Sequence, residues 1–182
     1  MTMRYRRART KGGRYFFTVT TFKREKILTQ PGNVKILCEA FRYIMEKHAV
    51  TIDAFVLLPD HLHCIWTLPQ NNRDFSTRSR LVKSYFTRKC DKKFKQTPWE
   101  SRKKKKEQAI WQCRFWEHLI RDEEDMERHV EYIDYNPVKH GLATSPNDSE
   151  YASFHRYVRK GTYKYEWGAG HEIYFVKTIG KE

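Results

Sequence analysis

Short runs of apolar, aromatic and β-branched residues in the first half of the chain predict three β-strands, at residues 15–22, 52–58 and 61–68. Pro59-Asp60, between the last two runs, is typical of a tight turn. Successive side chains of a strand point to opposite faces. The third strand therefore presents a polar-bearing face of His61, His63, Ile65 and Thr67 and an apolar face of Leu62, Cys64, Trp66 and Leu68.

Other stretches have apolar residues at helical spacing, which predicts a helix over Pro31–Lys47 and a second helix opened by Asp74. Residues 111–120 are expected to form a fourth strand, and a short helix is expected near 151–158. The solvent side of the second helix is expected to carry Arg78, Arg80, Lys83 and Arg88.

A third helix is predicted to start at the acidic run 122–125, where negative charge suits the helix dipole. We expect it to end at Asn136, because Pro137 disfavours helical backbone in the residue before it. Its packing stripe is Met126, Val130 and Ile133, and a neighbouring polar stripe contains Asp125, His129, Tyr132 and Asn136. Tyr132 and Asn136 thus lie one above the other. A half-buried tyrosine and a helix-ending asparagine would explain the same pattern.

The order strand, helix, strand, strand, helix, strand, helix predicts an α+β fold of ferredoxin-like plan, an antiparallel sheet with two helices on one face. The apolar face of the third strand is needed on the side of those helices, so the histidine face would be the open one. The additional C-terminal helix is expected along or beside that open face. The chain contains no internal repeat and no clear linker, so we expect one domain over residues 1–182.

The net charge is +14, from 36 Lys and Arg against 22 Asp and Glu, which makes nucleic acid the first partner to consider and a membrane surface the second. No apolar run is long enough to cross a bilayer, and no signal region follows the N-terminus. Four widely spaced cysteines fit a reducing cytoplasm. Candidate DNA contacts are Arg4, Arg6, Arg7, Arg9, Lys11 and Arg14 in an arm, Lys83 in the second helix, and Arg102, Lys103 and Lys104 in a basic loop. A solvated terminus and a solvated loop would have the same composition.

Two imidazoles on one strand face can bind one metal ion, although two unrelated histidines would give the same pattern. If the third helix lies on that face, His61, His63 and the Asn136 side-chain oxygen would hold Mg²⁺ or Mn²⁺. Tyr132 would then lie beside the metal as a nucleophile toward phosphorus. A phenol with a pKa near 10 needs a positive neighbourhood for this role.

Three segments, at residues 58–66, 115–118 and 129–141, closely resemble those of the REP-associated tyrosine transposases. These are bacterial relatives of single-tyrosine insertion-sequence transposases within the histidine–hydrophobic–histidine nuclease superfamily. The resemblance implies a ferredoxin-like nuclease domain that nicks single-stranded DNA at short palindromic hairpins. By position, His61 and His63 match the metal-binding pair, Tyr132 the nucleophile and Asn136 the third metal ligand. The departure from the family pattern is a basic insert at about 95–108.

We therefore expect a metal-dependent, single-stranded DNA endonuclease and transesterase that acts through a 5′-phosphotyrosine link. It would be one domain with a basic arm (4–14), a basic loop (about 88–108) and an aromatic C-terminal tail (about 138–182), acting as a monomer in the bacterial cytoplasm at the nucleoid. Two alternatives stay open. One is a non-catalytic module that binds single-stranded nucleic acid, against which the absence of an RNP-type pattern counts. The other is a phosphodiesterase that uses a metal-bound water.

Overall fold

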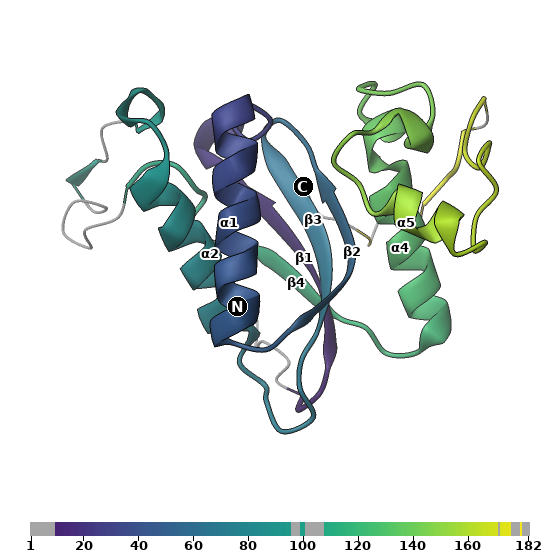
Figure 1. Cartoon of the computed structure of the whole chain (residues 1–182), viewed down its shortest axis with the longest axis horizontal. Coiled ribbons are helices and arrows are strands. Elements are labelled where there is room, and N and C mark those ends of the chain that lie inside the picture. The colour runs from purple at the N-terminus through teal and green to yellow at the C-terminus, as the bar shows by residue number, and fades with distance from the viewer. Residues whose placement is uncertain (1–9, 96–98, 101–107, 171, 176–178, 180–182) are drawn as a thin grey trace, which may run out of the picture.

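A computed structural model gives the fold of residues 10–95, 99–100, 108–170, 172–175 and 179 (Figure 1). Within them lies an antiparallel sheet in the order β2-β3-β1-β4. Its strands are β1 (Arg14–Thr20), β2 (Thr51–Leu57), β3 (His61–Thr67) and β4 (Trp116–Leu119). This order confirms the predicted ferredoxin-like, α+β plan.

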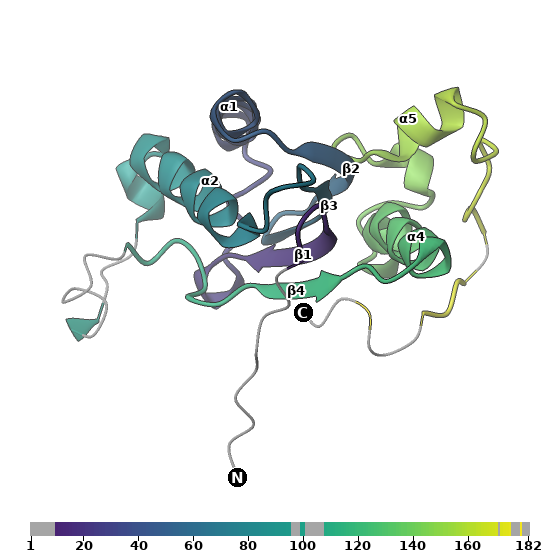
Figure 2. The ribbon, with the colours of Figure 1, turned by 90° about the horizontal axis from the view of Figure 1, so that it is seen from below.

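Two helices, α1 (Pro31–Lys47) and α2 (Phe75–Lys89), cover one face of the sheet (Figure 2). Leu62, Cys64 and Trp66 of β3 pack there in one buried cluster with Leu37 of α1 and Val82 of α2. The alternation along β3 therefore orients the strand as predicted, because a shift of one residue would put the two histidines into this apolar layer.

A third long helix, α4 (Glu123–Lys139), lies on the opposite face of the sheet (Figure 2). Val130 and Ile133 of α4 pack against Phe16 of β1 and Ile65 of β3, which confirms the predicted packing stripe. The helix is capped by Asp122, whose side chain accepts a hydrogen bond from the backbone N–H of Asp125 at 2.7 Å. The face left open by the ferredoxin-like plan is thus closed by the helix that carries Tyr132.

The outer edge of β2 is covered by the segment that leads into α5 (Phe154–Arg159). Leu57 donates its backbone N–H to the carbonyl of Tyr151, and Ser153 donates its own to the carbonyl of Phe55. Short 3-10 helices lie at Phe22–Arg24, Lys92–Phe94 and Pro146–Asp148. Within the described part of the chain, no helix has both the length and the apolar character to cross a membrane.

Three local predictions were wrong. α4 does not end before Pro137 but continues to Lys139, and the N–H of His140 still donates to the carbonyl of Asn136. The missing N–H of one proline removes one helical hydrogen bond, which the surrounding helix tolerates here. The fourth strand is shorter than expected, since β4 begins at Trp116 and Trp111 forms an isolated bridge to Thr21.

Arg78 was the third error, because it was expected on the solvent side of the second helix and is 3% exposed. Its guanidinium donates to the backbone carbonyls of His48 at 3.3 Å, Ala49 at 2.9 Å and Asp74 at 2.6 Å. Its charge is buried against carbonyl oxygens just after α1 and at the start of α2, an arrangement that helical periodicity cannot reveal.

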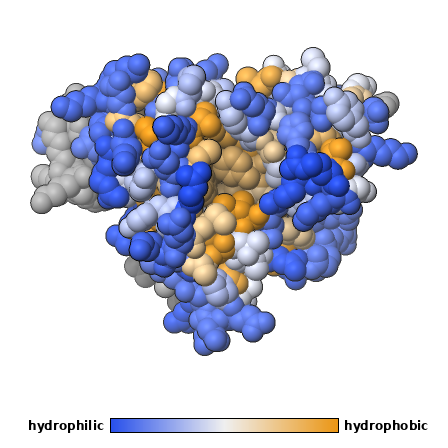
Figure 3. All heavy atoms as spheres, in the orientation of Figure 1, coloured by the Kyte–Doolittle hydropathy of each residue, from blue (hydrophilic) through white to orange (hydrophobic). Residues whose placement is uncertain are grey.

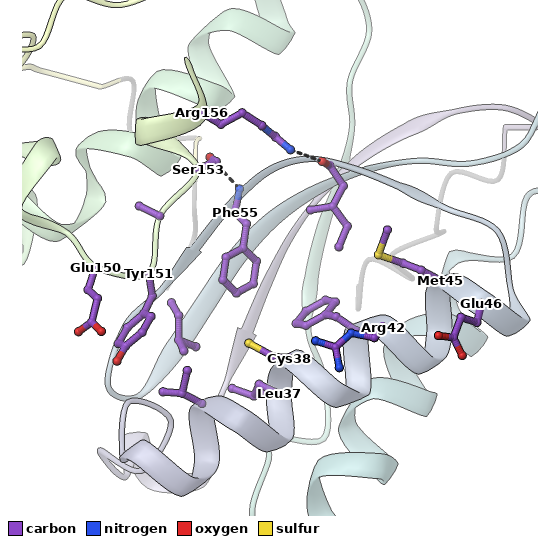
Figure 4. Close-up of a pocket in the computed structure, with 15 residues that line it drawn as sticks. Leu37, Cys38, Arg42, Met45, Glu46, Phe55, Glu150, Tyr151, Ser153 and Arg156 are labelled. Carbon is purple, nitrogen blue, oxygen red and sulfur yellow. Dashed lines mark hydrogen bonds between the residues drawn. The ribbon is translucent and has the colours of Figure 1, made fainter. Parts of the chain in front are cut away.

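An apolar groove of about 870 Å³ lies between α1, β2 and the segment before α5. Hydrophobic side chains gather in this hollow on the face shown in Figure 3. Phe55 from β2 and Cys38 from α1 point toward each other across it (Figure 4). None of the residues predicted to form the catalytic site lines this groove.

Candidate nuclease site

The two histidines of β3 lie side by side beneath α4. His61 is 1% exposed and His63 is 0% exposed. Their ring centroids are 4.9 Å apart, and the ring planes are inclined by 80°. The local cause is the strand itself, since residues two apart project from the same face.

His61 is oriented by the residue before it, because its Nδ1 lies 2.7 Å from Oδ1 of Asp60. The other oxygen of that carboxylate accepts a hydrogen bond from Arg24 at 2.9 Å. Burial would raise the pKa of Asp60, but the hydrogen bonds from His61 and Arg24 outweigh it and hold the pKa below its usual range. Arg24 and its neighbour Lys23 adopt left-handed backbone conformations with φ of 55° and 54°. This strained turn brings the guanidinium to the carboxylate.

His63 is oriented in the same way by the neighbouring strand. Thr18 of β1 lies opposite His63 in the sheet register, and its Oγ1 is 2.9 Å from Nδ1 of His63. In both rings Nδ1 makes the orienting contact, so a metal ion would be bound through Nε2. An acceptor such as a carboxylate on the other ring nitrogen is the usual arrangement around a metal-binding histidine, and the Thr18 hydroxyl can accept in the same way. The histidine pair therefore fits the divalent metal predicted from the sequence.

The helix α4 brings Tyr132 to this pair. Tyr132 is 1% exposed, and its ring centroid lies 5.4 Å from that of His63. Phe16 and Phe175 enclose the phenol ring, at centroid distances of 6.0 and 5.3 Å. Asn136, one turn further along the helix, is fully buried. The structure thus unites His61, His63 and Tyr132 in one place, with Asn136 on the same helix, and their chemical roles remain predictions.

Two residues near the site were not predicted from the sequence. Lys139 donates from Nζ to the Tyr132 hydroxyl at 2.9 Å, with Nζ 4.8 Å from the centroid of the same ring. The ring of His140 lies 5.0 Å from that of His61. Extending the helix past Pro137 would have placed Lys139 seven residues, or about two turns, from Tyr132 on one helix face. The expectation that the helix ends before Pro137 leaves Lys139 outside the helix, so the sequence did not predict its position beside Tyr132.

Among the described residues, one group of three His and Asp side chains is compact enough to hold a metal, formed by His118, Asp125 and His129. The Asp125 carboxylate already accepts hydrogen bonds from the His118 ring at 2.8 Å and from the Arg121 side chain at 3.1 Å. Burial would raise the pKa of Asp125, but the hydrogen bonds from Arg121 and His118 hold it well below its usual range. The rings of His118 and His129 stack at 4.6 Å. These contacts attach the first turn of α4 to β4 and so help position Tyr132.

The predicted DNA contacts are only partly placed by the structure. Lys11 is exposed, whereas Arg14 forms a 2.6 Å ion pair with Glu123 at the start of α4. Lys83 donates to the backbone carbonyl of Gln112 at 2.8 Å, a structural contact that the sequence did not predict. Their roles toward DNA remain predictions. Seven predicted contacts lie outside the described residues: Arg4, Arg6, Arg7, Arg9, Arg102, Lys103 and Lys104.

Comparison with known proteins identifies the family. The family described as IS200-like transposases matches residues 10–136. A REP-associated tyrosine transposase of Escherichia coli is 41% identical over 164 residues, which are 90% of this chain and 89% of that protein. This chain belongs to the REP-associated tyrosine transposases. It is accordingly a DNA-cleaving and DNA-joining enzyme.

Two further relatives extend the comparison. A Haemophilus influenzae protein is 41% identical over 170 residues, covering 93% of this chain and 95% of the relative. A solved structure of a REP-associated tyrosine transposase bound to a REP hairpin matches with a TM-score of 0.76 and 38% identity. The matched region covers 95% of this chain and 99% of the chain in the solved structure. This chain therefore shares its fold with that transposase over almost its whole length.

Proposed function

We propose that this transposase cleaves and rejoins single-stranded DNA at palindromic hairpins, with Tyr132 as the nucleophile and a divalent metal held by His61, His63 and Asn136. The observation that carries the proposal is the 5.4 Å separation of the Tyr132 and His63 rings. Residues 69 positions apart in the chain meet at one buried place, and a phenol beside two oriented imidazoles is a combination suited to phosphoryl transfer.

The donor set supports Mg²⁺ or Mn²⁺ as the metal. Two imidazoles and an amide oxygen form a mixed, incomplete set, which leaves coordination positions for water and phosphate oxygens. When bound, such an ion neutralises charge on a phosphate oxygen and makes phosphorus more electrophilic. Asp60 and Thr18 keep the two rings in the orientation that this requires.

The chain's own part in the reaction is nucleophilic attack. The Tyr132 oxygen bonds to phosphorus, the bond from phosphorus to the 3′ oxygen breaks, and that oxygen leaves as a 3′-hydroxyl. The DNA is then held through a 5′-phosphotyrosine bond, which conserves the phosphodiester energy. A 3′-hydroxyl can later attack the same phosphorus and restore the strand, so no nucleotide cofactor is required.

Hairpin DNA as the substrate is supported by the relative that was solved with a REP hairpin and by the net charge of +14. Positive charge concentrates nucleic acid at the surface, and base-reading groups would then select the hairpin. We further propose that a monomer is the active species, because one chain supplies all four predicted site residues.

The test compares Tyr132→Phe with Tyr135→Phe on hairpin-bearing single strands in Mn²⁺, resolved on a denaturing gel. Tyr135 is the matched control, since it is 5% exposed and its ring packs against Trp167 and Phe175. Loss of the phenolic oxygen from Tyr132 should eliminate both strand cleavage and the covalent protein–DNA band, while Tyr135→Phe should retain both.

Each alternative function predicts a different pattern of cleavage and covalent bands. A phosphodiesterase that uses a metal-bound water would continue to cut after Tyr132→Phe. A binding module would shift the hairpin in a native gel and cut it in none of the variants. A covalent band that survives Tyr132→Phe and disappears in Tyr135→Phe would assign the nucleophile to Tyr135.

A further inference from the structure

The last turn of α4 places the ammonium group of Lys139 beside Tyr132, the proposed nucleophile. Lys139 Nζ donates to the Tyr132 oxygen at 2.9 Å and also lies 4.8 Å from the centroid of that ring. This contact exists because the helix continues through Pro137 instead of ending there. A phenol needs a positive neighbourhood to act as a nucleophile, and Lys139 is a cation that contacts the Tyr132 oxygen.

A role in capping the helix does not account for this position. At the end of α4 the carbonyls of Asn136, Pro137 and Val138 accept hydrogen bonds from the backbone N–H groups of His140, Leu142 and Gly141. The C-terminal acceptors that a lysine commonly serves therefore already have backbone donors. The ammonium group instead contacts a side-chain oxygen two turns earlier.

We infer that Lys139 is a catalytic residue, which stabilises negative charge on the Tyr132 oxygen during both cleavage and rejoining. This inference rests on the proposed function. In cleavage the phenol loses its proton to solvent, the bond from its oxygen to phosphorus forms, and the bond from phosphorus to the 3′ oxygen breaks. The 3′ oxygen takes up a proton from water and leaves as a hydroxyl, so the proton released by the phenol is balanced.

Rejoining runs in reverse, so the Tyr132 oxygen is then the leaving group and carries the charge. A hydrogen bond from an ammonium group is stronger to a phenolate than to a neutral phenol or to an aryl phosphate ester. Lys139 thus stabilises the same oxygen as nucleophile in one direction and as leaving group in the other. The consequence is that its loss slows both directions, while hairpin binding depends on other groups.

The experiment measures single-turnover rates of cleavage and of rejoining, together with the dissociation constant for a hairpin-bearing strand, for four proteins. They are the wild type, Lys139→Met, Lys139→Arg and Lys47→Met. Lys47 is an exposed lysine on α1, across the sheet from Tyr132, and its substitution removes the same charge elsewhere. Lys139→Met should lower both rates roughly 10- to 100-fold, the size expected for a charge-assisted hydrogen bond. Its affinity for the hairpin should change no more than that of Lys47→Met, and Lys139→Arg should retain most of the rate.

Chemical rescue separates a charge effect from a packing effect. Lys139→Cys treated with 2-bromoethylamine gains an ammonium group at the position of the lysine nitrogen, which should restore both rates. Treated wild type is the control, because Cys38 and Cys113 are exposed and will also react.

The outcomes distinguish this inference from the proposed function. Wild-type rates in Lys139→Met, with the wild-type covalent band intact, would overturn the role of Lys139 and leave the proposed function standing. If neither aminoethylation of Lys139→Cys nor the Lys139→Arg variant restores the rates, Lys139 acts through packing, and the inference is overturned. Cutting by the wild type without any covalent band would overturn both.

Discussion

The Asp60 carboxylate lies 2.7 Å from Nδ1 of His61, the residue directly after it. Its second oxygen accepts from Arg24 at 2.9 Å. The carboxylate thus determines which nitrogen of His61 carries the proton and directs the other toward the site. Removing it would leave the imidazole free to adopt other tautomers and orientations.

We therefore expect Asp60→Ala to lower the affinity for Mn²⁺ about 10- to 100-fold, the usual effect of removing a partner of a metal-binding histidine. Asp60→Asn keeps an acceptor oxygen for His61, so its affinity for Mn²⁺ should fall less than that of Asp60→Ala. The measurement is the cleavage rate as a function of Mn²⁺ concentration for both variants and the wild type. Equal Mn²⁺ requirements in all three proteins would show that this contact does not support a metal site.

The basic arm is expected to recognise the hairpin rather than only attract DNA. Deleting residues 1–9 removes Arg4, Arg6, Arg7 and Arg9 and leaves Thr10, whose backbone contacts the Tyr15 hydroxyl, in place. Discrimination between a hairpin with its flanking bases and a scrambled strand should fall, because arginine can read guanine edges.

The matched control for the arm replaces Arg102, Lys103, Lys104 and Lys105 by Ala, which removes the same number of positive charges. Both changes should weaken nonspecific binding and its salt dependence, since each lost phosphate contact reduces the slope by roughly 0.7 to 0.9. Binding titrations at several salt concentrations separate the loss of nonspecific binding from the loss of hairpin discrimination. If the ratio of affinities for the hairpin and the scrambled strand falls in the control and not in the arm deletion, the bases are recognised by the basic loop.

Asp134 should make stability depend on pH. Its side chain is fully buried and accepts a 3.0 Å hydrogen bond from Ser153. Burial raises its pKa from 3.8 to about 7, so the folded protein holds this proton where the unfolded chain has released it. The stability that this group contributes is complete below pH 3.8 and is lost as the pH rises to about 7.

Asp134→Asn keeps an acceptor for Ser153 and removes the ionisation. The free energy of unfolding of the variant should therefore exceed that of the wild type by a margin that grows from pH 4 to 7, to on the order of 2–4 kcal/mol. Urea unfolding across this range measures it, with the exposed Asp148→Asn as control. A margin that is constant with pH would show that Asp134 ionises in the folded protein as it does in water.

Local backbone geometry explains what the sequence by itself determined. The period of two along residues 61–68 was enough to place His61 and His63 together and opposite Leu62, Cys64 and Trp66. The helical period was enough to put Tyr132 one turn before Asn136, and the acidic residues Asp74 and Asp122 marked helix starts that the structure confirms. These relations join residues within a few positions of one another, where backbone dihedral angles leave few alternatives.

The tertiary structure alone decided which distant groups meet. The sequence offered no signal that Thr18 would orient His63, that Arg24 would hold Asp60, or that Arg78 would be buried. It also favoured ending α4 at Pro137, whereas packing of α4 on the sheet sustains one more turn and brings Lys139 to Tyr132. Such contacts depend on how whole elements pack, and the free energy of that packing overrides the local preference of a single residue.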